Sequence, residues 1–199
     1  AEIDKDLQQA RAIQQALVPE RRRVIGTSRI SLLLQPCGHV GGDLVGMFSP
    51  GQARLGLYAI DVSGHGITSA MVTARVAGYL SSKFLEQNLA LEQSDGAHFT
   101  MRPPEETVQR LNQRLAADPG VDQYLTMAFV SGDLATGHMR IVQAGHPPAL
   151  ILRTDGSTEF VGVTGLPVGM LDDVAYDAVD FRLFPGDRLF LYTDGFTEA

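Results

Sequence analysis

Three aspartates occur in similar settings, each with glycine within a few residues, which leaves open space beside a carboxylate. Asp43 follows two glycines, Asp61 precedes the Ser-Gly-His-Gly segment at 63–66, and Asp194 precedes Gly195. Oxygen-only ligands favour Mg²⁺ or Mn²⁺ over zinc, so three converging carboxylates would suit such a cation. Without a cation, their mutual repulsion would raise their pKa values. Since Asp-Gly is also an ordinary turn signal, the alternative is three turn aspartates with solvated side chains.

The pattern of apolar residues predicts the elements that would carry these aspartates. Alternation over 55–61 is typical of a buried strand that ends on Asp61. Helical spacing predicts a core helix over 67–85, with Met71 packed inside, and a second helix over 103–118. The acid at the strand end would then lie just before the first of these helices.

Short apolar runs separated by turn sequences fill most of the remaining chain. Such runs predict antiparallel hairpins, and the last run would place Asp194 at a strand end. Strands and helices in separate blocks indicate a layered α+β domain, because parallel βαβ units would alternate throughout. The runs are 30–34, 125–130, 139–143, 149–152, 158–161, 181–184 and 188–192.

The N-terminal segment predicts an amphipathic helix that ends before Pro19. Its apolar stripe packs either on its own domain or on an upstream domain or second copy. A helix that starts at residue 1 without a cap favours a connecting or dimerising helix. The stripe is formed by Ile3, Leu7, Ala10, Ile13 and Leu17.

Length, charge and cysteine content narrow the class of protein. With 199 residues, 44% of them hydrophobic, the chain fits one ordinary globular domain. Its net charge of −7 disfavours nucleic-acid binding, which depends on Lys and Arg displacing counterions. No apolar run approaches the roughly 18 residues needed to span a bilayer, and the N-terminus lacks a signal-peptide pattern. The single cysteine, Cys37, excludes an intrachain disulfide and fits a reducing compartment. From the cysteine content, the charge and the lack of a long apolar run together, we expect a cytoplasmic protein without nucleic-acid or membrane partners.

Five motifs, in order along the chain, resemble those of the SpoIIE/RsbU-type branch of the PPM (PP2C-like) metal-dependent serine/threonine phosphatases. The resemblance covers nearly the whole chain, since the N-terminal segment is similar to the linker helix of this family. It implies an α-β-β-α sandwich of two antiparallel sheets flanked by helices, in agreement with the α+β block pattern. The motifs are Val40–Asp43, Asp61–Gly66, Ala144–Pro148, Gly165–Gly169 and Leu191–Ala199.

The resemblance also implies a binuclear Mn²⁺ or Mg²⁺ centre at one end of the sandwich. Carried over residue by residue, Asp61 bridges the two metals, the carbonyl of Val62 binds the first, and Asp194 binds the second. Asp43 reaches the cluster directly or through water. Such centres hydrolyse phosphomonoesters by acidifying a bridging water, so no protein nucleophile is required. The chain accordingly has no G-x-S-x-G elbow, no Cys loop with a paired Arg and no P-loop.

Two histidines lie inside these motifs. His65, between two glycines, could shape the phosphate pocket or hydrogen-bond the turn. His146, before two prolines, could be a general acid or a pin for a tight turn. We expect the structural role for both, because metal–water chemistry proceeds without them. Cys37 and His39 offer too few ligands for a zinc site.

The chain departs from the family pattern in two places. Leu44–Met47 follow Asp43, where the family commonly has aromatic and acidic residues, so an outer hydrogen bond from this segment is missing. The family pattern also continues into a last helix and a strand whose acid pair completes the second metal, whereas this chain stops at Ala199. We therefore expect a linker helix from an upstream regulatory domain at 1–22 and a phosphatase domain at 23–199 without its last helix and strand.

The residues and the resemblance together predict a metal-dependent protein serine/threonine phosphatase of bacterial signalling. The resemblance implies a phosphorylated small regulatory protein, an anti-sigma-factor antagonist, as substrate. Expected partners are an upstream sensor or receiver domain and a second copy bound through the N-terminal helix. The departures keep a second hypothesis open, in which a catalytically impaired PP2C-like fold serves as a protein-binding adaptor of a response regulator.

Overall fold

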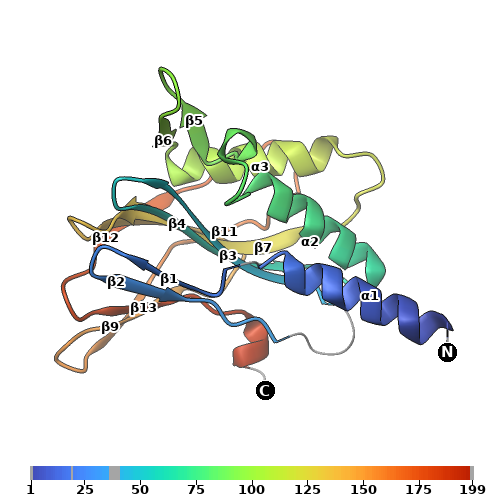
Figure 1. Cartoon of the computed structure of the whole chain (residues 1–199), viewed down its shortest axis with the longest axis horizontal. Coiled ribbons are helices and arrows are strands. Elements are labelled where there is room, and N and C mark those ends of the chain that lie inside the picture. The colour runs from blue at the N-terminus through green and yellow to red at the C-terminus, as the bar shows by residue number, and fades with distance from the viewer. Residues whose placement is uncertain (1, 19, 36–40, 198–199) are drawn as a thin grey trace.

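Two β-sheets packed face to face form the body of the structure, a computed structural model that describes residues 2–18, 20–35 and 41–197 (Figure 1). For residues 2–7 and 10 only the backbone is described. The larger sheet has the strand order β11-β8-β7-β4-β3, with β12 paired to β8, and the smaller sheet has the order β10-β9-β13. Their strands are β3 (Asp43–Gly51), β4 (Arg54–Val62), β7 (Leu125–Asp133), β8 (His138–Ala144), β9 (Ala149–Leu152), β10 (Thr158–Val161), β11 (Thr164–Gly165), β12 (Ala178–Arg182) and β13 (Arg188–Phe190).

The central strand β7 is buried on both faces, which explains its continuous apolar run. Met127 and Phe129 belong to a core on the helical side of the larger sheet. Ala128 and Val130 belong to a second core between the two sheets. Because side chains alternate along a strand, the position of a residue relative to these four shows which core it faces.

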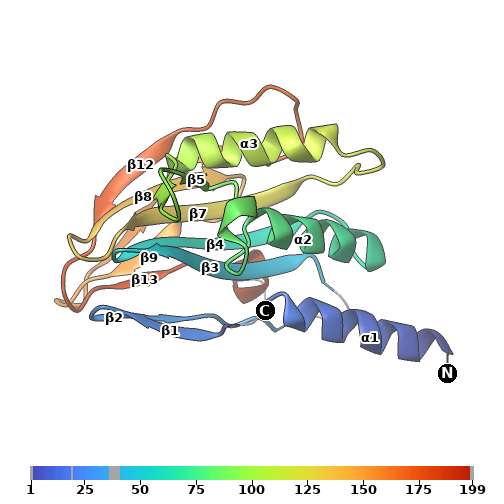
Figure 2. The ribbon, with the colours of Figure 1, turned by 45° about the horizontal axis from the view of Figure 1, so that its top comes forward.

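Helices α2 (Ile67–Tyr79) and α3 (Pro104–Ala117) cover the outer face of the larger sheet (Figure 2). α3 begins with proline, whose missing N–H is unneeded in a first turn, and its first turn carries Glu105 and Glu106, which suit the positive end of the helix dipole. Each fully buried aliphatic side chain contributes about 2 kcal/mol of transfer free energy. On α3 these side chains are Val108, Leu111 and Leu115.

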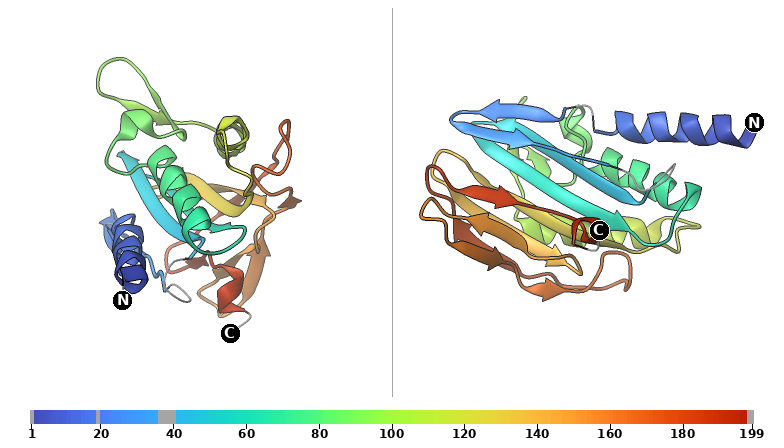
Figure 3. Two further views of the ribbon diagram at one scale, coloured as in Figure 1. Left: turned by 90° about the vertical axis from the view of Figure 1, so that its right-hand side faces the viewer. Right: turned by 90° about the horizontal axis from the view of Figure 1, so that it is seen from below.

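The remaining elements surround this sandwich. α1 (Glu2–Ala16) runs alongside α2 at the β3 edge of the larger sheet (Figures 2 and 3). The first hairpin packs Ile30 against Met47 and Leu55. Within the described part of the chain, no helix is long and apolar enough to cross a membrane. The short elements are β1 (Arg22–Ile25), β2 (Ser28–Ser31), β5 (Leu91–Gln93), β6 (Phe99–Met101) and the single 3₁₀ turns η1 (Leu85–Gln87) and η2 (Asp194–Phe196).

The predicted α+β class and the layered antiparallel sheets are confirmed. β9 and β10 coincide with the runs at 149–152 and 158–161, while the run at 30–34 forms a strand only as far as Ser31. The strand β1, which pairs with β2, escaped prediction because its sequence, Arg-Arg-Val-Ile, lacks apolar alternation. Cys37 and His39 lie outside the described residues.

The predicted helix over 67–85 is too long and its buried face is misassigned. α2 ends at Tyr79, and the following loop is closed by Asn88, whose side chain donates to the Ser81 carbonyl at 2.9 Å. Met71 is 59% exposed. The hydroxyls of the buried face donate to backbone carbonyls, which offsets the cost of burying them. That face consists of Ser69, Val72, Thr73 and Val76.

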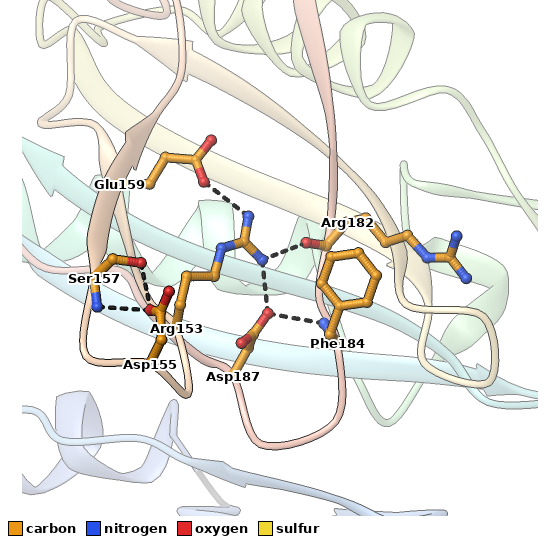
Figure 4. Close-up of polar contacts among 7 residues, drawn as sticks. All are labelled: Arg153, Asp155, Ser157, Glu159, Arg182, Phe184 and Asp187. Carbon is orange, nitrogen blue, oxygen red and sulfur yellow. Dashed lines mark hydrogen bonds and ion pairs between the residues drawn. The ribbon is translucent and has the colours of Figure 1, made fainter.

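The turn at 185–187 does not close the predicted hairpin. β12 pairs with β8 and β13 pairs with β9, so residues 183–187 carry the chain from the larger sheet to the smaller one. Arg153 holds this crossing by donating to the Arg182 carbonyl at 2.8 Å and to Asp187 at 2.6 Å, and it also pairs with Glu159 (Figure 4). The network fastens both sheets together at the end of β13 that lies away from Asp194.

Candidate active site

Asp43 and Asp61 are direct cross-strand partners at one end of the larger sheet. Asp61 is in turn opposite Thr126 on the next strand, β7. Side chains of directly opposed residues lie on the same face of a sheet. Since Thr126 alternates in phase with Ala128, which packs between the sheets, all three polar side chains face the smaller sheet. β4 therefore places Asp61 between the two sheets at one end of the sandwich, which we call the mouth. The alternation predicted a strand that ends on Asp61, and β4 ends one residue later, at Val62.

Asp194 approaches this mouth from the smaller sheet. β13 ends at Phe190, and Asp194 is the first residue of η2, so the prediction that it ends a strand is wrong. Its side chain is exposed. Its charge nevertheless acts on both Asp43 and Asp61. The fold thus brings together the three aspartates that the sequence singled out, two from one layer and one from the other.

The electrostatics of Asp43 and Asp61 are those of crowded carboxylates. Burial, followed by the charges of Asp43 and Asp194, raises the pKa of Asp61 to about 6. Burial and the charge of Asp194 also raise the pKa of Asp43, against the opposing effect of the Thr193 hydroxyl. Both carboxylates are therefore costly to ionise in the absence of a cation.

The Gly41–Gly42 segment fixes the backbone just before Asp43. The Gly42 carbonyl accepts from the backbone N–H of Val62 at 3.1 Å and from the Thr73 hydroxyl of α2 at 3.2 Å. A Cβ on residue 42 would collide with the Val62 carbonyl oxygen, so only glycine permits this approach. Val62, predicted as a backbone ligand, is thereby placed beside the residue that precedes Asp43.

His146 lies buried behind the mouth and links its two sides. Its Nε2 is 2.8 Å from the Tyr192 carbonyl, which can only accept, so the proton is on Nε2. Nδ1 then accepts from the Thr126 hydroxyl at 2.9 Å. Burial lowers the pKa of His146 to about 4, despite the Tyr192 carbonyl and the Asp194 charge. The ring is therefore neutral at pH 7, and its hydrogen bonds join β7 to the segment before Asp194 rather than holding the tight turn in which we expected a structural role.

His65 is exposed in the turn that joins β4 to α2. Gly64 and Gly66 on either side adopt positive φ values of 85° and 82°, which glycine adopts without strain. Ser63 closes the turn, since its N–H donates to the Tyr124 carbonyl at 2.8 Å and its Oγ accepts from the Tyr124 N–H at 3.1 Å. Among the described residues, the His65 ring has no hydrogen-bond partner. The hydrogen bonds that we expected from His65 in this turn are made by Ser63 instead.

The motif at 165–169 supports the site from outside. Val168 and Leu125 exchange two backbone hydrogen bonds at the start of β7, and the Gly145 N–H donates to the Gly165 carbonyl at 2.7 Å. Asn112 of α3 is fully buried and accepts from the Gly169 N–H at 2.6 Å. The motif therefore braces the loop that carries His146.

The carboxylates of the three aspartates suit a hard divalent cation, although they do not form a compact group of ligands among the described residues. Asp43, Asp61 and Asp194 offer oxygen ligands only, and their repulsion would be relieved by positive charge. In residues 2–18, 20–35 and 41–197, no group of three or more His, Cys, Asp or Glu side chains is close enough to hold a metal ion.

Two polar residues near the mouth were not singled out from the sequence, although Thr193 lies inside the motif at 191–199. Thr126 sits within an apolar run, and only the β4–β7 register reveals that it faces Asp61. Thr193 precedes Asp194 and acts on Asp43 across the mouth. The sole sequence signal for Thr126 is its spacing: it lies two residues before Ala128 and four before Val130, on the same face of β7.

The layered fold is that of PP2C-type phosphatase domains. The SiaA-PP2C domain of Pseudomonas aeruginosa superimposes with a TM-score of 0.72 at 20% identity, covering 98% of this chain and 73% of that one. The structure of the RsbU and RsbW domains of Rv1364c from Mycobacterium tuberculosis matches with a TM-score of 0.61 at 27% identity, covering 78% of this chain and 39% of that one.

The sequence places the chain more narrowly. The family model described as Stage II sporulation protein E (SpoIIE) matches residues 51–199, so the chain belongs to the SpoIIE family of PP2C-like phosphatases. Phosphoserine phosphatase RsbP of Bacillus subtilis (strain 168) is 28% identical over 191 residues, which are 96% of this chain and 45% of RsbP. The chain therefore spans less than half the length of that relative. The family that the five motifs indicated is confirmed.

Proposed function

We propose that the chain is a metal-dependent protein phosphatase domain that hydrolyses phosphoserine or phosphothreonine on a small regulatory protein. The observation that carries the proposal is the cross-strand pair Asp43 and Asp61, desolvated and facing Asp194 at the mouth of the sandwich. Membership of the SpoIIE family and the likeness to a phosphoserine phosphatase support the same chemistry.

The proposed roles follow from where each group lies. Asp61, central in the row of polar side chains, would bridge two cations, with the Val62 carbonyl and Asp194 as further ligands and Asp43 bound directly or through water. Bound Mn²⁺ or Mg²⁺ would acidify water and offset charge on the phosphate oxygens. His146 and Thr126 link the two sides of the mouth by hydrogen bonds. Because the His146 ring is neutral, it does not offset the negative charge of the aspartates.

The proposed biological setting is a signalling protein with further domains. An anti-sigma-factor antagonist is the proposed substrate, and an upstream sensor or receiver domain is the proposed regulator. In this proposal residues 1–22 are the linker, and residues 23–199 belong to the phosphatase domain. The family match, which covers 51–199, and the position of α1 beside α2 are compatible with this division.

The test is hydrolysis of a phosphoserine peptide and of para-nitrophenyl phosphate with and without Mn²⁺. The wild type should turn over only with the cation, and Asp61→Asn should be inactive while retaining its circular dichroism spectrum. Asp95→Asn, in the exposed turn between β5 and β6, is the matched control and should keep wild-type turnover. Wild-type activity in Asp61→Asn would contradict the assignment.

A second candidate function is that of a protein-binding adaptor with impaired catalysis. The observation in its favour is that no compact group of three ligands exists among the described residues. Under this proposal the wild type would bind Mn²⁺ weakly or not at all and show no turnover. It would still bind its partner, and Asp61→Asn would leave that binding unchanged.

A further inference from the structure

Helix α1 sends one buried polar side chain towards the candidate active site. Gln14 is 3% exposed, whereas Ile13 beside it is 63% exposed and Gln15 is also exposed. Leu17 is partly buried and Val18 is 4% exposed, and both pack on the core beneath the helices. Among the residues whose side chains are described, Gln14 of α1 and Leu17 and Val18 just after it meet the domain. Of the predicted stripe, Leu17 packs on the core and Ile13 is exposed.

The Gln14 amide binds both backbone groups of Gly41. Its Nε2 donates to the Gly41 carbonyl, and the Gly41 N–H donates to its Oε1 at 3.1 Å. A carboxamide is suited to this task because it carries a donor and an acceptor side by side. β3 begins only at Asp43, so Gln14 supplies the pairing that a neighbouring strand would otherwise give.

Three elements thus hold the two glycines that precede Asp43. α1 binds Gly41 through Gln14, α2 binds the Gly42 carbonyl through Thr73, and β4 binds the same carbonyl through the Val62 N–H. Glycines carry no side chain that could anchor this segment. The β3–β4 pairing sets Asp43 opposite Asp61, and these outside contacts hold the backbone that leads into Asp43.

We infer that Gln14 is a positioning residue for Asp43, which makes α1 part of the active-site scaffold. This inference rests on the proposed function, because it assigns Asp43 to cation binding. The apolar contacts of Leu17 and Val18 dock α1, so Gln14 is not needed for docking alone. Loss of the amide should loosen Gly41–Asp43 and weaken cation binding while α1 stays in place.

The test compares Gln14→Met, which keeps the length and removes the amide, with Gln15→Met on the exposed side of α1. Amide hydrogen exchange at Gly41 and Mn²⁺ affinity by calorimetry are measured for each. Gln14→Met should speed exchange at Gly41 and raise the Mn²⁺ Kd, each by about tenfold, as expected for losing a buried hydrogen-bonded pair. Gln15→Met should match the wild type in both measurements.

A second arm uses Asp43→Asn to separate positioning from a general structural role. If Gln14 acts through Asp43, Gln14→Met should raise the Mn²⁺ Kd no further in the Asp43→Asn background. Equal effects in both backgrounds, or faster exchange with unchanged Mn²⁺ affinity, would overturn the inference and leave Gln14 as a docking contact. Wild-type protein that binds Mn²⁺ without turnover would contradict the proposed phosphatase but not the positioning role. Wild-type protein that binds no Mn²⁺ would overturn both.

Discussion

The Nε2–H of His146 donates a hydrogen bond of 2.8 Å to the carbonyl of Tyr192, two residues before Asp194. Through its other nitrogen the same ring accepts from Thr126, the cross-strand neighbour of Asp61. One buried imidazole therefore joins the strand that faces Asp61 to the segment that carries Asp194. This link connects the two layers beside the aspartates.

Replacing His146 by alanine should cost stability and weaken cation binding together. The change leaves the Thr126 hydroxyl and the Tyr192 carbonyl without a partner and opens a cavity, which together cost about 2–4 kcal/mol. Thr126→Val removes one of the two hydrogen bonds and should cost about 1 kcal/mol. Urea unfolding measures both changes. A His146→Ala variant as stable as the wild type would show that the ring does not hold the two layers.

Among the groups that shape the pH dependence of stability without metal, Asp61 and His146 should contribute with opposite signs. Asp61 has a raised pKa of about 6, so its ionisation destabilises the fold, and this cost is relieved as pH falls from about 6 to about 4. His146 has a lowered pKa of about 4, so the fold loses stability as pH falls from about 6.5 to about 4. Asp61→Asn should remove the first contribution alone.

At pH 7 the metal-free Asp61→Asn variant should therefore be more stable than the wild type, by on the order of 2 kcal/mol. Its stability should then fall more steeply than that of the wild type on acidification, because the opposing contribution is gone. Thermal unfolding between pH 4 and pH 8 provides the measurement, with Asp95→Asn as control. Identical curves for wild type and Asp61→Asn would mean that Asp61 is not electrostatically crowded.

The sequence predicted the parts of the site that depend on local pattern. Alternation over 55–61 was enough to place Asp61 at a strand end, and proline with two acids was enough to place α3. Which strands pair is decided by contacts between residues far apart in the chain, so the register of Asp43, Asp61 and Thr126 was not predictable. The five motifs indicated the family, and through it the roles that we propose for the aspartates.

Other features opposed their local pattern and were missed for that reason. Gln14 and Thr73 are polar residues on buried helix faces. The Gln14 amide pairs with the distant backbone of Gly41, and the Thr73 hydroxyl lies within hydrogen-bond distance of the local Ser69 carbonyl and the distant Gly42 carbonyl. Met71 is apolar and exposed, since α2 turns its small and hydroxyl-bearing side towards the sheet. Hydrophobic periodicity alone assigns all three to the wrong environment.

Divalent cations should stabilise the protein by neutralising the aspartates at the mouth. Mn²⁺ binds the folded form preferentially, so the melting temperature should rise with Mn²⁺ concentration, and the rise should be lost in Asp61→Asn. Ca²⁺, with its laxer geometry, should stabilise without supporting hydrolysis. Differential scanning fluorimetry at pH 7 tests this. A melting temperature indifferent to millimolar Mn²⁺ would favour the adaptor.

Arg153 should matter for stability but not for cation binding. Its guanidinium joins Asp187, Glu159 and the Arg182 carbonyl at the far end of β13 (Figure 4). Arg153→Met keeps the aliphatic stem and removes these bonds, so it should lower the melting temperature while the Mn²⁺ Kd stays at the wild-type value. A weakened Mn²⁺ affinity in this variant would show that the two ends of the sandwich are coupled.

The exposed side of α1 should serve association rather than folding. Ile13 is 63% exposed, so Ile13→Glu removes no contact within the domain and should leave the melting temperature and the Mn²⁺ Kd unchanged. If a second copy or an upstream domain covers this side, a buried glutamate there would weaken the association, since an unpaired charge is costly to desolvate. Sedimentation velocity of the wild type and the variant, in the chain with its neighbouring domains, measures the effect. Arg11→Glu, also on the exposed side of α1, shows whether charge alone is responsible. Unfolding of Ile13→Glu with unchanged association would instead make this side of the helix part of the domain core.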